Sequence, residues 1–256
     1  MSIDGNIDYA LTRVHARQAL LADEVTWRRI ESSRDLPHYV GALRATTLQD
    51  WVATIDLGHD VHAIERVLRA QWRTYVADVA AWHPREWQPW LEWLAWLSGL
   101  SLLARLARPE PAPAWLLADP IYGPAAVGSP AERAAALTPT ALAPLAPAIL
   151  AHTSILEAWQ RHWQQLLPRS DAHTRQMLDA LLAILREHAQ AMRMATQSGD
   201  AIRAELARRL ARLLRLAAGT IVVTVCHLAL QALQLERLRG GLARRRAFTV
   251  AADVVR

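Results

Sequence analysis

Two histidines one helical turn apart are the residues of this chain closest to metal-ligand spacing. His59 and His62 stand beside Asp56 and Asp60 in the segment TIDLGHDVHAI, and imidazoles at this spacing can bind one metal ion. No third ligand pattern supports such a site, and at the beginning of a helix these residue types more often cap the helix or stay solvated. We therefore predict no metal and no cofactor.

The absence of lysine argues against several classes of enzyme. All 29 basic residues are arginine, whereas P-loop ATPases, protein kinases and pyridoxal enzymes each need a particular lysine. The sequence also lacks a Gly-x-Ser-x-Gly elbow, a dinucleotide-binding glycine pattern and a His-Glu-x-x-His motif. Its single cysteine, Cys226, can form no intrachain disulfide. The sequence predicts a protein without a catalytic constellation, located in a reducing cytoplasm.

Tryptophans are concentrated in the segment AWHPREWQPWLEWLAWL, residues 81–97. Trp90 and Trp93 share a helical face with Leu97 and Leu100, and core packing is the expected role because each indole buries a large area. The alternative is a partner interface, since exposed tryptophans often anchor binding surfaces. On that alternative, Trp90 and Trp93 are the candidate contact residues.

Arginines cluster in the segment LQLERLRGGLARRR, residues 233–246. Basic side chains near the end of a helix interact favourably with its dipole, and the Gly240–Gly241 pair is expected to stop or kink that helix. A nucleic-acid arm would show a longer basic block or interleaved aromatics, so we expect no nucleic-acid partner. An acidic protein or anionic lipid headgroups remain open as partners. The candidate contact residues are Arg237, Arg239, Arg244 and Arg245.

The elements that carry these residues are predicted to be helices throughout. Alanine, leucine and arginine dominate the composition, and valine and isoleucine are sparse, which favours an all-α protein. Asp60 is expected to cap a helix whose apolar residues recur at three- and four-residue steps to Trp82. Further helices are expected at 7–30, 47–57, 89–108, 148–167, 171–196, 200–218 and 220–245.

A proline-rich stretch divides the chain. Nine of the 13 prolines fall between Pro109 and Pro147, so residues 109–148 are predicted to be a connector or a run of short helices. They separate an N-terminal lobe, residues 1–108, from a basic C-terminal lobe, residues 149–256, which holds 16 arginines against 8 acidic residues. Similar residues recur at an offset of 138 positions, which suggests that the two lobes are similar.

Residues 216–233, LAAGTIVVTVCHLALQAL, carry no formal charge. This is the minimum length for a membrane span. Thr220, Thr224, His227 and Gln231 recur every three or four residues, however, and therefore predict a polar stripe on one helical face. We interpret the segment as a buried helix whose polar face touches solvent.

The segment LALQALQLERLRGGL, residues 228–242, resembles the helix that ends each repeat in the C subunits of the archaeal and bacterial V-type ATPases, a family similar to the d subunits of the eukaryotic enzymes. Those repeats close on an acidic residue, a leucine-arginine pair and a glycine followed by a base. Glu236, Leu238, Arg239 and Gly240 match this pattern, and Gly241 and Leu242 stand where the base would be expected.

The N-terminal segment YALTRVHARQALL is similar to the opening helix of that family, with Tyr9, Arg13, Val14, Ala16 and Leu21 in the matching places. HDVHAIERVLRAQW and LAWLSGLSLLARL resemble the long helices of its first lobe. The likeness extends over residues 7–108 and 149–248. Family members usually carry three lobes, whereas this shorter chain has prolines where more helix would be expected, so two or three lobes remain open.

The resemblance implies a funnel-like bundle of similar helical lobes and a non-catalytic socket in the central stalk of a rotary ATPase. The implied partners are the membrane ring and the other central-stalk subunits, with no small-molecule substrate. The implied location is peripheral, on the cytoplasmic face of the membrane, with the membrane surface reached through the complex. The transported ion, a proton or sodium, stays open. The alternative function is a stand-alone helical interaction protein diverged from that family.

Overall fold

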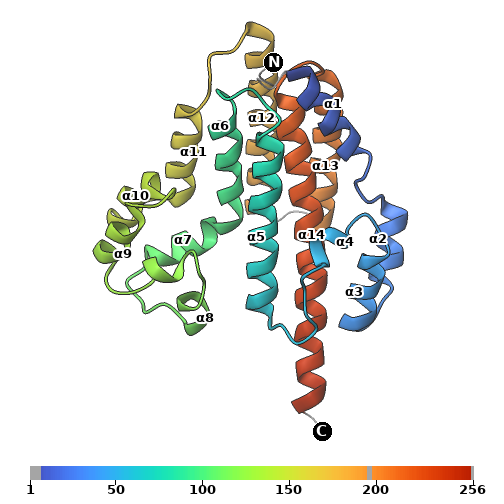
Figure 1. Cartoon of the computed structure of the whole chain (residues 1–256), viewed down its shortest axis with the longest axis vertical. Coiled ribbons are helices and arrows are strands. Elements are labelled where there is room, and N and C mark those ends of the chain that lie inside the picture. The colour runs from blue at the N-terminus through green and yellow to red at the C-terminus, as the bar shows by residue number, and fades with distance from the viewer. Residues whose placement is uncertain (1–6, 195–197, 255–256) are drawn as a thin grey trace. The chain divides into compact units, whose positions relative to one another are not determined.

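The structure, a computed structural model, describes residues 7–194 and 198–254, and every regular element within them is helical (Figure 1). The prediction of an all-α protein is confirmed. The helices form two compact units, one of Met1–Arg85 with Arg169–Arg256 and one of Glu86–Pro168. The boundaries expected from the proline content, 1–108, 109–148 and 149–256, differ from these units. The difference arises because helices from both ends of the chain pack together, while the proline-rich stretch folds with the tryptophan-rich segments beside it.

The first unit is built around its last helix. Its elements are α1 (Ile7–Gln18), α2 (Glu24–Glu31), α3 (Leu36–Arg44), α4 (Gln49–Val52), α5 (Val61–Ala80), α12 (Ala172–Met194), α13 (Gly199–Leu216) and α14 (Val222–Val254). Helix α14 packs against α1, α3, α5, α12 and α13, and Figure 1 shows it running between α5 on one side and α2, α3 and α4 on the other. Segments separated by some 200 residues therefore share one core.

Aspartate caps determine where three of the early helices begin. Asp23, Asp35 and Asp60 each accept a hydrogen bond from the backbone N–H three residues later, which satisfies a donor that the first turn leaves open. The predicted cap at Asp60 is confirmed. The single helix expected over 7–30 is wrong, because the Asp23 cap starts a second helix after a break. The helix expected over 47–57 is also too long, since α4 covers four residues.

A glycine separates α13 from α14. Gly219 has a φ of +81°, a conformation that costs glycine little and that commonly ends a helix. The predicted boundary near residue 219 is confirmed. Helix α14 then continues through Gly240 and Gly241 to Val254, so the expectation that these glycines stop the helix is wrong. The helix expected at 171–196 corresponds to α12, which ends at Met194. Residues 195 and 196 lie outside the described residues.

The start of α14 holds the uncharged segment. Thr220, Thr224, His227 and Gln231 are all buried, so the interpretation of a solvent-facing polar stripe is wrong. Tertiary packing covers this stripe, and His227 of the stripe contacts Gln18 of α1 and Tyr75 of α5. Within residues 7–194 and 198–254, no helix has both the length and the apolar character needed to cross a membrane.

The second unit consists of short helices. They are α6 (Gln88–Glu92), the 3₁₀ helix η1 (Trp93–Gly99), α7 (Leu100–Leu106), α8 (Ala114–Leu117), η2 (Gly123–Ala125), α9 (Pro130–Leu137), η3 (Ala143–Leu145), α10 (Ala146–Leu150) and α11 (Ile155–Gln165). The run of short helices predicted for 109–148 is confirmed, and Ser129 with Glu132 forms a capping box at α9. The prediction of one continuous helix over 89–108 is wrong. The 3₁₀ helix η1 interrupts it, beginning at Trp93, which stacks on Trp159.

Candidate functional site

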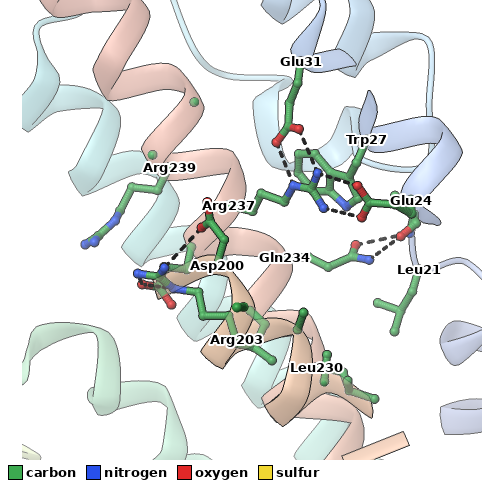
Figure 2. Close-up of a pocket in the computed structure, with 18 of the residues that line it drawn as sticks. Leu21, Glu24, Trp27, Glu31, Asp200, Arg203, Leu230, Gln234, Arg237 and Arg239 are labelled. Atoms are coloured by element: carbon green, nitrogen blue, oxygen red, sulfur yellow. Dashed lines mark hydrogen bonds and ion pairs between the residues drawn. The ribbon is translucent and has the colours of Figure 1, made fainter. Parts of the chain in front are cut away.

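Arg237 of α14 is bound on two sides by glutamates of α2. Its Nε lies 2.7 Å from Glu31 Oε1, and its Nη1 lies 2.7 Å from Glu24 Oε2. The guanidinium also stands 4.8 Å from the centre of the Trp27 ring. The hydrogen bonds that Arg237 donates to Glu31 and Glu24 raise the pKa of Arg237, and Arg237 in turn lowers the pKa of Glu24. This predicted contact residue therefore joins two helices of its own chain (Figure 2).

Arg245 is also used within the chain. It is 5% exposed, and its guanidinium donates to the backbone carbonyls of Glu31, Ser33 and Gly241 at 2.7–3.1 Å. The Glu31 carbonyl belongs to the last residue of α2, where the helix supplies no donor for it, and Ser33 lies two residues beyond that end. The guanidinium stands 3.8 Å from the centre of the Tyr39 ring, and burial lowers the pKa of Arg245. The placement of Arg237 and Arg245 in a partner interface is thus not supported, because both are engaged internally.

Arg239 and Arg244 are the predicted arginines that reach the surface. The Arg239 side chain is about half exposed, and its Nη1 lies 3.7 Å from Glu65 Oε1, a weak ion pair. Arg244 is exposed. Figure 2 shows Arg239 and Arg237 pointing to opposite sides of α14. Helical periodicity accounts for this separation, because two residues two positions apart lie on nearly opposite faces of a helix.

Trp90 and Trp93 are buried in the second unit, at 1% and 5% exposure. Trp90 stacks on Trp163 with 4.8 Å between ring centres, and Trp93 stacks on Trp159. The indole N–H groups of Trp93 and Trp159 donate to each other's backbone carbonyl, and that of Trp163 donates to the carbonyl of Trp90. Their assignment to a partner interface is therefore wrong. Core packing, the other interpretation, agrees with this burial, and the indoles fasten α11 to α6 and η1.

A polar cluster that the sequence pattern did not identify lies inside the first unit. His227 Nδ1 is 2.7 Å from the side-chain oxygen of Gln18, and its Nε2 is 2.7 Å from the Tyr75 hydroxyl. A neutral imidazole that donates from Nδ1 and accepts at Nε2 satisfies both contacts. His83 Nε2 lies 3.0 Å from Thr224 Oγ1. The polar stripe at 220–231 is the sequence signal for this cluster, but it does not identify the partners on α1 and α5.

Burial alters the titration of three groups around this cluster. Burial, with smaller effects of Arg17 and His15, lowers the pKa of His227 to about 4. Burial lowers the pKa of His83 to about 4 and raises the pKa of the Cys226 thiol to about 12. Both imidazoles are therefore neutral near pH 7, and the cysteine remains a protonated thiol rather than a reactive thiolate.

Of the two histidines with metal-ligand spacing, His59 takes part in local structure. Asp60 caps α5, and His59 Nδ1 accepts the backbone N–H of Asp56 at 3.3 Å. The backbone N–H of Gly58 donates to Asp56 Oδ1. Among the side chains that the structure describes, no group of three or more His, Cys, Asp or Glu residues is placed to hold a metal ion.

A groove of about 970 Å³ follows α14 on the surface of the first unit (Figure 2). Residues of α14 between Leu230 and Arg244 form its floor, residues between Leu21 and Glu31 line one wall, and residues of α13 between Asp200 and Ala207 line the other. We call this feature the α14 groove. It brings together Arg237, Arg239 and Arg244, three of the predicted contact residues, whereas Trp90 and Trp93 lie in the other unit.

No family model matches this chain, and comparisons with curated proteins and with solved structures also return no match.

Proposed function

We propose that this chain is a non-catalytic coupling subunit in the central stalk of a V-type rotary ATPase, linking the membrane ring to the catalytic head. The observation that carries the proposal is the position of α14. The segment that resembles the family's repeat-ending helix forms the centre of α14, and α14 is the helix on which the first unit is assembled. A coupling subunit needs such a helix, held from several sides, because torque must pass through packed surfaces.

Charge-assisted hydrogen bonds support a stiff attachment of α14. Arg237 binds two glutamates of α2, and Arg245 binds carbonyls at the end of the same helix. Bidentate guanidinium contacts restrain direction as well as distance. The His227 contacts to Gln18 and Tyr75 add restraints to α1 and α5. Rotation of α14 relative to its neighbours would break several of these bonds at once.

Exposed arginines on α13 supply a surface for an acidic partner. Arg212 and Arg215 are exposed and lie one turn apart on the helix. Complementary charge speeds association and selects the partner. We expect these side chains to face acidic surfaces of the ring or of the stalk in the assembled complex, with the chain attached peripherally on the cytoplasmic side of the membrane.

Affinity purification from the native organism tests this proposal. The tagged full chain should co-purify from detergent-solubilised membranes with ring and catalytic subunits of a rotary ATPase, identified by mass spectrometry. Replacing Arg212 and Arg215 with glutamate should reduce recovery of those subunits by about ten-fold, equivalent to 1.4 kcal/mol. The matched control is Arg175→Glu, an exposed position on α12, which should leave recovery unchanged.

Two results would contradict the proposal. A rotary ATPase purified intact from the same cells without this chain would exclude a stalk role. Recovery of a stable complex that contains this chain and no rotary ATPase subunit would instead favour the stand-alone helical interaction protein. The position of the gene offers an independent check, because a stalk subunit is expected beside genes for the catalytic and ring subunits.

A further inference from the structure

The α14 groove has the length of a short helix. Seven of its α14 residues recur at three- and four-residue steps and therefore lie on one face: Leu230, Leu233, Gln234, Arg237, Gly240, Gly241 and Arg244. Glu236 and Arg239 line the groove outside this face. At 1.5 Å per residue this face extends about 21 Å, or about four helical turns. Both walls belong to the same unit as the floor.

Most polar groups of the groove are already paired inside the chain. The Gln234 amide donates to the Ala22 carbonyl and accepts the Ala22 N–H. Arg203 binds Glu236 at 2.9 Å, and Arg237 binds the two glutamates of α2. A bound segment therefore needs to offer few hydrogen bonds in exchange, because the groove leaves few polar groups open. On the α13 side the groove is lined by the small side chains of Ala201, Ala204 and Ala207. Small side chains permit the close approach of another helix backbone.

Gly240 leaves the lining of the groove open to the close approach of another backbone. It is exposed within α14, and a Cβ at this position would meet no atom of the chain within 4 Å. Glycine inside a helix lowers the folding equilibrium constant about five-fold relative to alanine. Gly241 is different, because a Cβ there would collide with the Tyr39 ring. Packing within the chain thus explains Gly241. The space at Gly240 is open, as it is at Gly41 of α3, but only Gly240 lies in the lining of the groove, where it permits the close approach of another backbone.

The end of the groove near Arg244 is electropositive. Arg244 is exposed, and among the side chains described no carboxylate lies within ion-pair distance of it. Arg239, beside Gly240, is half exposed with only the weak contact to Glu65. Carboxylates line the rest of the groove, with Glu24 and Glu31 toward α2 and with Asp200 and Glu236 toward α13. They would repel a nucleic-acid backbone. A protein segment with its own carboxylates at one end fits this distribution.

We propose that the α14 groove is the docking surface for one α-helix of a partner protein, which crosses α14 at Gly240 and places a carboxylate against Arg244. Helix-in-groove recognition of this kind uses contacts repeated at three- and four-residue steps. Groove-to-groove docking of two copies of this chain is disfavoured, because two concave grooves do not fill each other. The proposal does not depend on the rotary-ATPase assignment and holds equally for a stand-alone interaction protein.

Site-specific photo-crosslinking in the native organism tests the proposal on the full chain. p-Benzoylphenylalanine replaces Ala204, on the wall of the groove, and in a control strain replaces Gln176, which is exposed on α12. Crosslinks from position 204 should map to one helical segment that contains aspartate or glutamate. Adding Gly240→Ala or Arg244→Glu should each lower that crosslink about ten-fold, the effect of 1.4 kcal/mol.

Matched variants separate loss of docking from loss of folding. Gly41 is an exposed helical glycine of α3 whose Cβ would also meet no atom within 4 Å, and it lies outside the groove. Gly41→Ala and Gly240→Ala should both raise the folding equilibrium constant about five-fold in urea titrations. Only Gly240→Ala should weaken the crosslink. Arg175→Glu on α12, outside the groove lining, should not reproduce the effect of Arg244→Glu.

Several outcomes would overturn the proposal. Position 204 could give no crosslink beyond that of position 176, or it could capture a nucleic acid, a lipid or a second copy of this chain. A crosslinked protein segment without carboxylates would also contradict it, as would a crosslink that survives both groove substitutions. Because the mapped segment identifies the partner directly, a partner unrelated to any rotary ATPase would support the groove while contradicting the proposed function.

Discussion

The buried histidines make the stability of this protein sensitive to mild acid. His227 is fully buried with Gln18 and Tyr75, and His83 is fully buried against Thr224. Burial lowers both pKa values from 6.5 to about 4. In this interval the unfolded chain binds protons that the folded chain does not, so the free energy of unfolding falls as pH decreases below about 6.5 and levels off below about 4.

The size of the effect follows from the pKa difference. Each unit by which the pH decreases across this interval lowers the free energy of unfolding by about 1.4 kcal/mol per histidine. Acidification from about pH 7 to pH 5 spans about 1.5 units below the unfolded-state pKa, so each buried histidine should remove about 2 kcal/mol. Two such groups should remove about 4 kcal/mol, a large share of the 5–15 kcal/mol typical of folded proteins.

Urea titrations at several pH values between 7 and 5, followed by circular dichroism, measure this dependence. His227→Gln should lose about half of the pH dependence, and a His83→Gln, His227→Gln double variant most of it. The slopes are compared rather than the absolute stabilities, because each substitution also alters packing. The reasoning is refuted if the wild-type stability changes by less than about 0.5 kcal/mol across this range, or if the His227→Gln variant keeps the full wild-type slope.

Three further predictions concern groups that the structure places inside the chain, each measured by urea unfolding. Arg237→Met should lower the free energy of unfolding by about 1–2 kcal/mol, because it breaks half-buried contacts to two glutamates. Arg239→Met should lower it by less than about 0.5 kcal/mol. Equal losses would contradict the assigned contacts. Arg245→Met should cost about 3 kcal/mol, since buried carbonyls lose their donor, and an unchanged midpoint would contradict this. Trp163→Phe should cost about 1–3 kcal/mol by leaving the Trp90 carbonyl without its indole donor, and a neutral effect would contradict that role.

Local properties of the sequence determined the class of fold and several boundaries. Helix-favouring composition and three- to four-residue periodicity depend on each segment alone, and so does the Asp60 cap. Proline content predicted the short helices of residues 109–148 for the same reason. These features require no knowledge of which segments meet in space. The resemblance in residues 228–242, and the stalk function that it implies, remain predictions.

Tertiary structure decided which residues are available to a partner. Periodicity places Arg237 and Arg245 on particular faces of α14, but the groups opposite them, at Glu31 and Ser33, lie more than 200 positions away in the sequence. A charged side chain looks the same in the sequence whether it binds a neighbouring helix or faces solvent. Burial and pairing are set by long-range packing, and for this reason the structure leaves Arg239 and Arg244 exposed while it places Trp90 in a core.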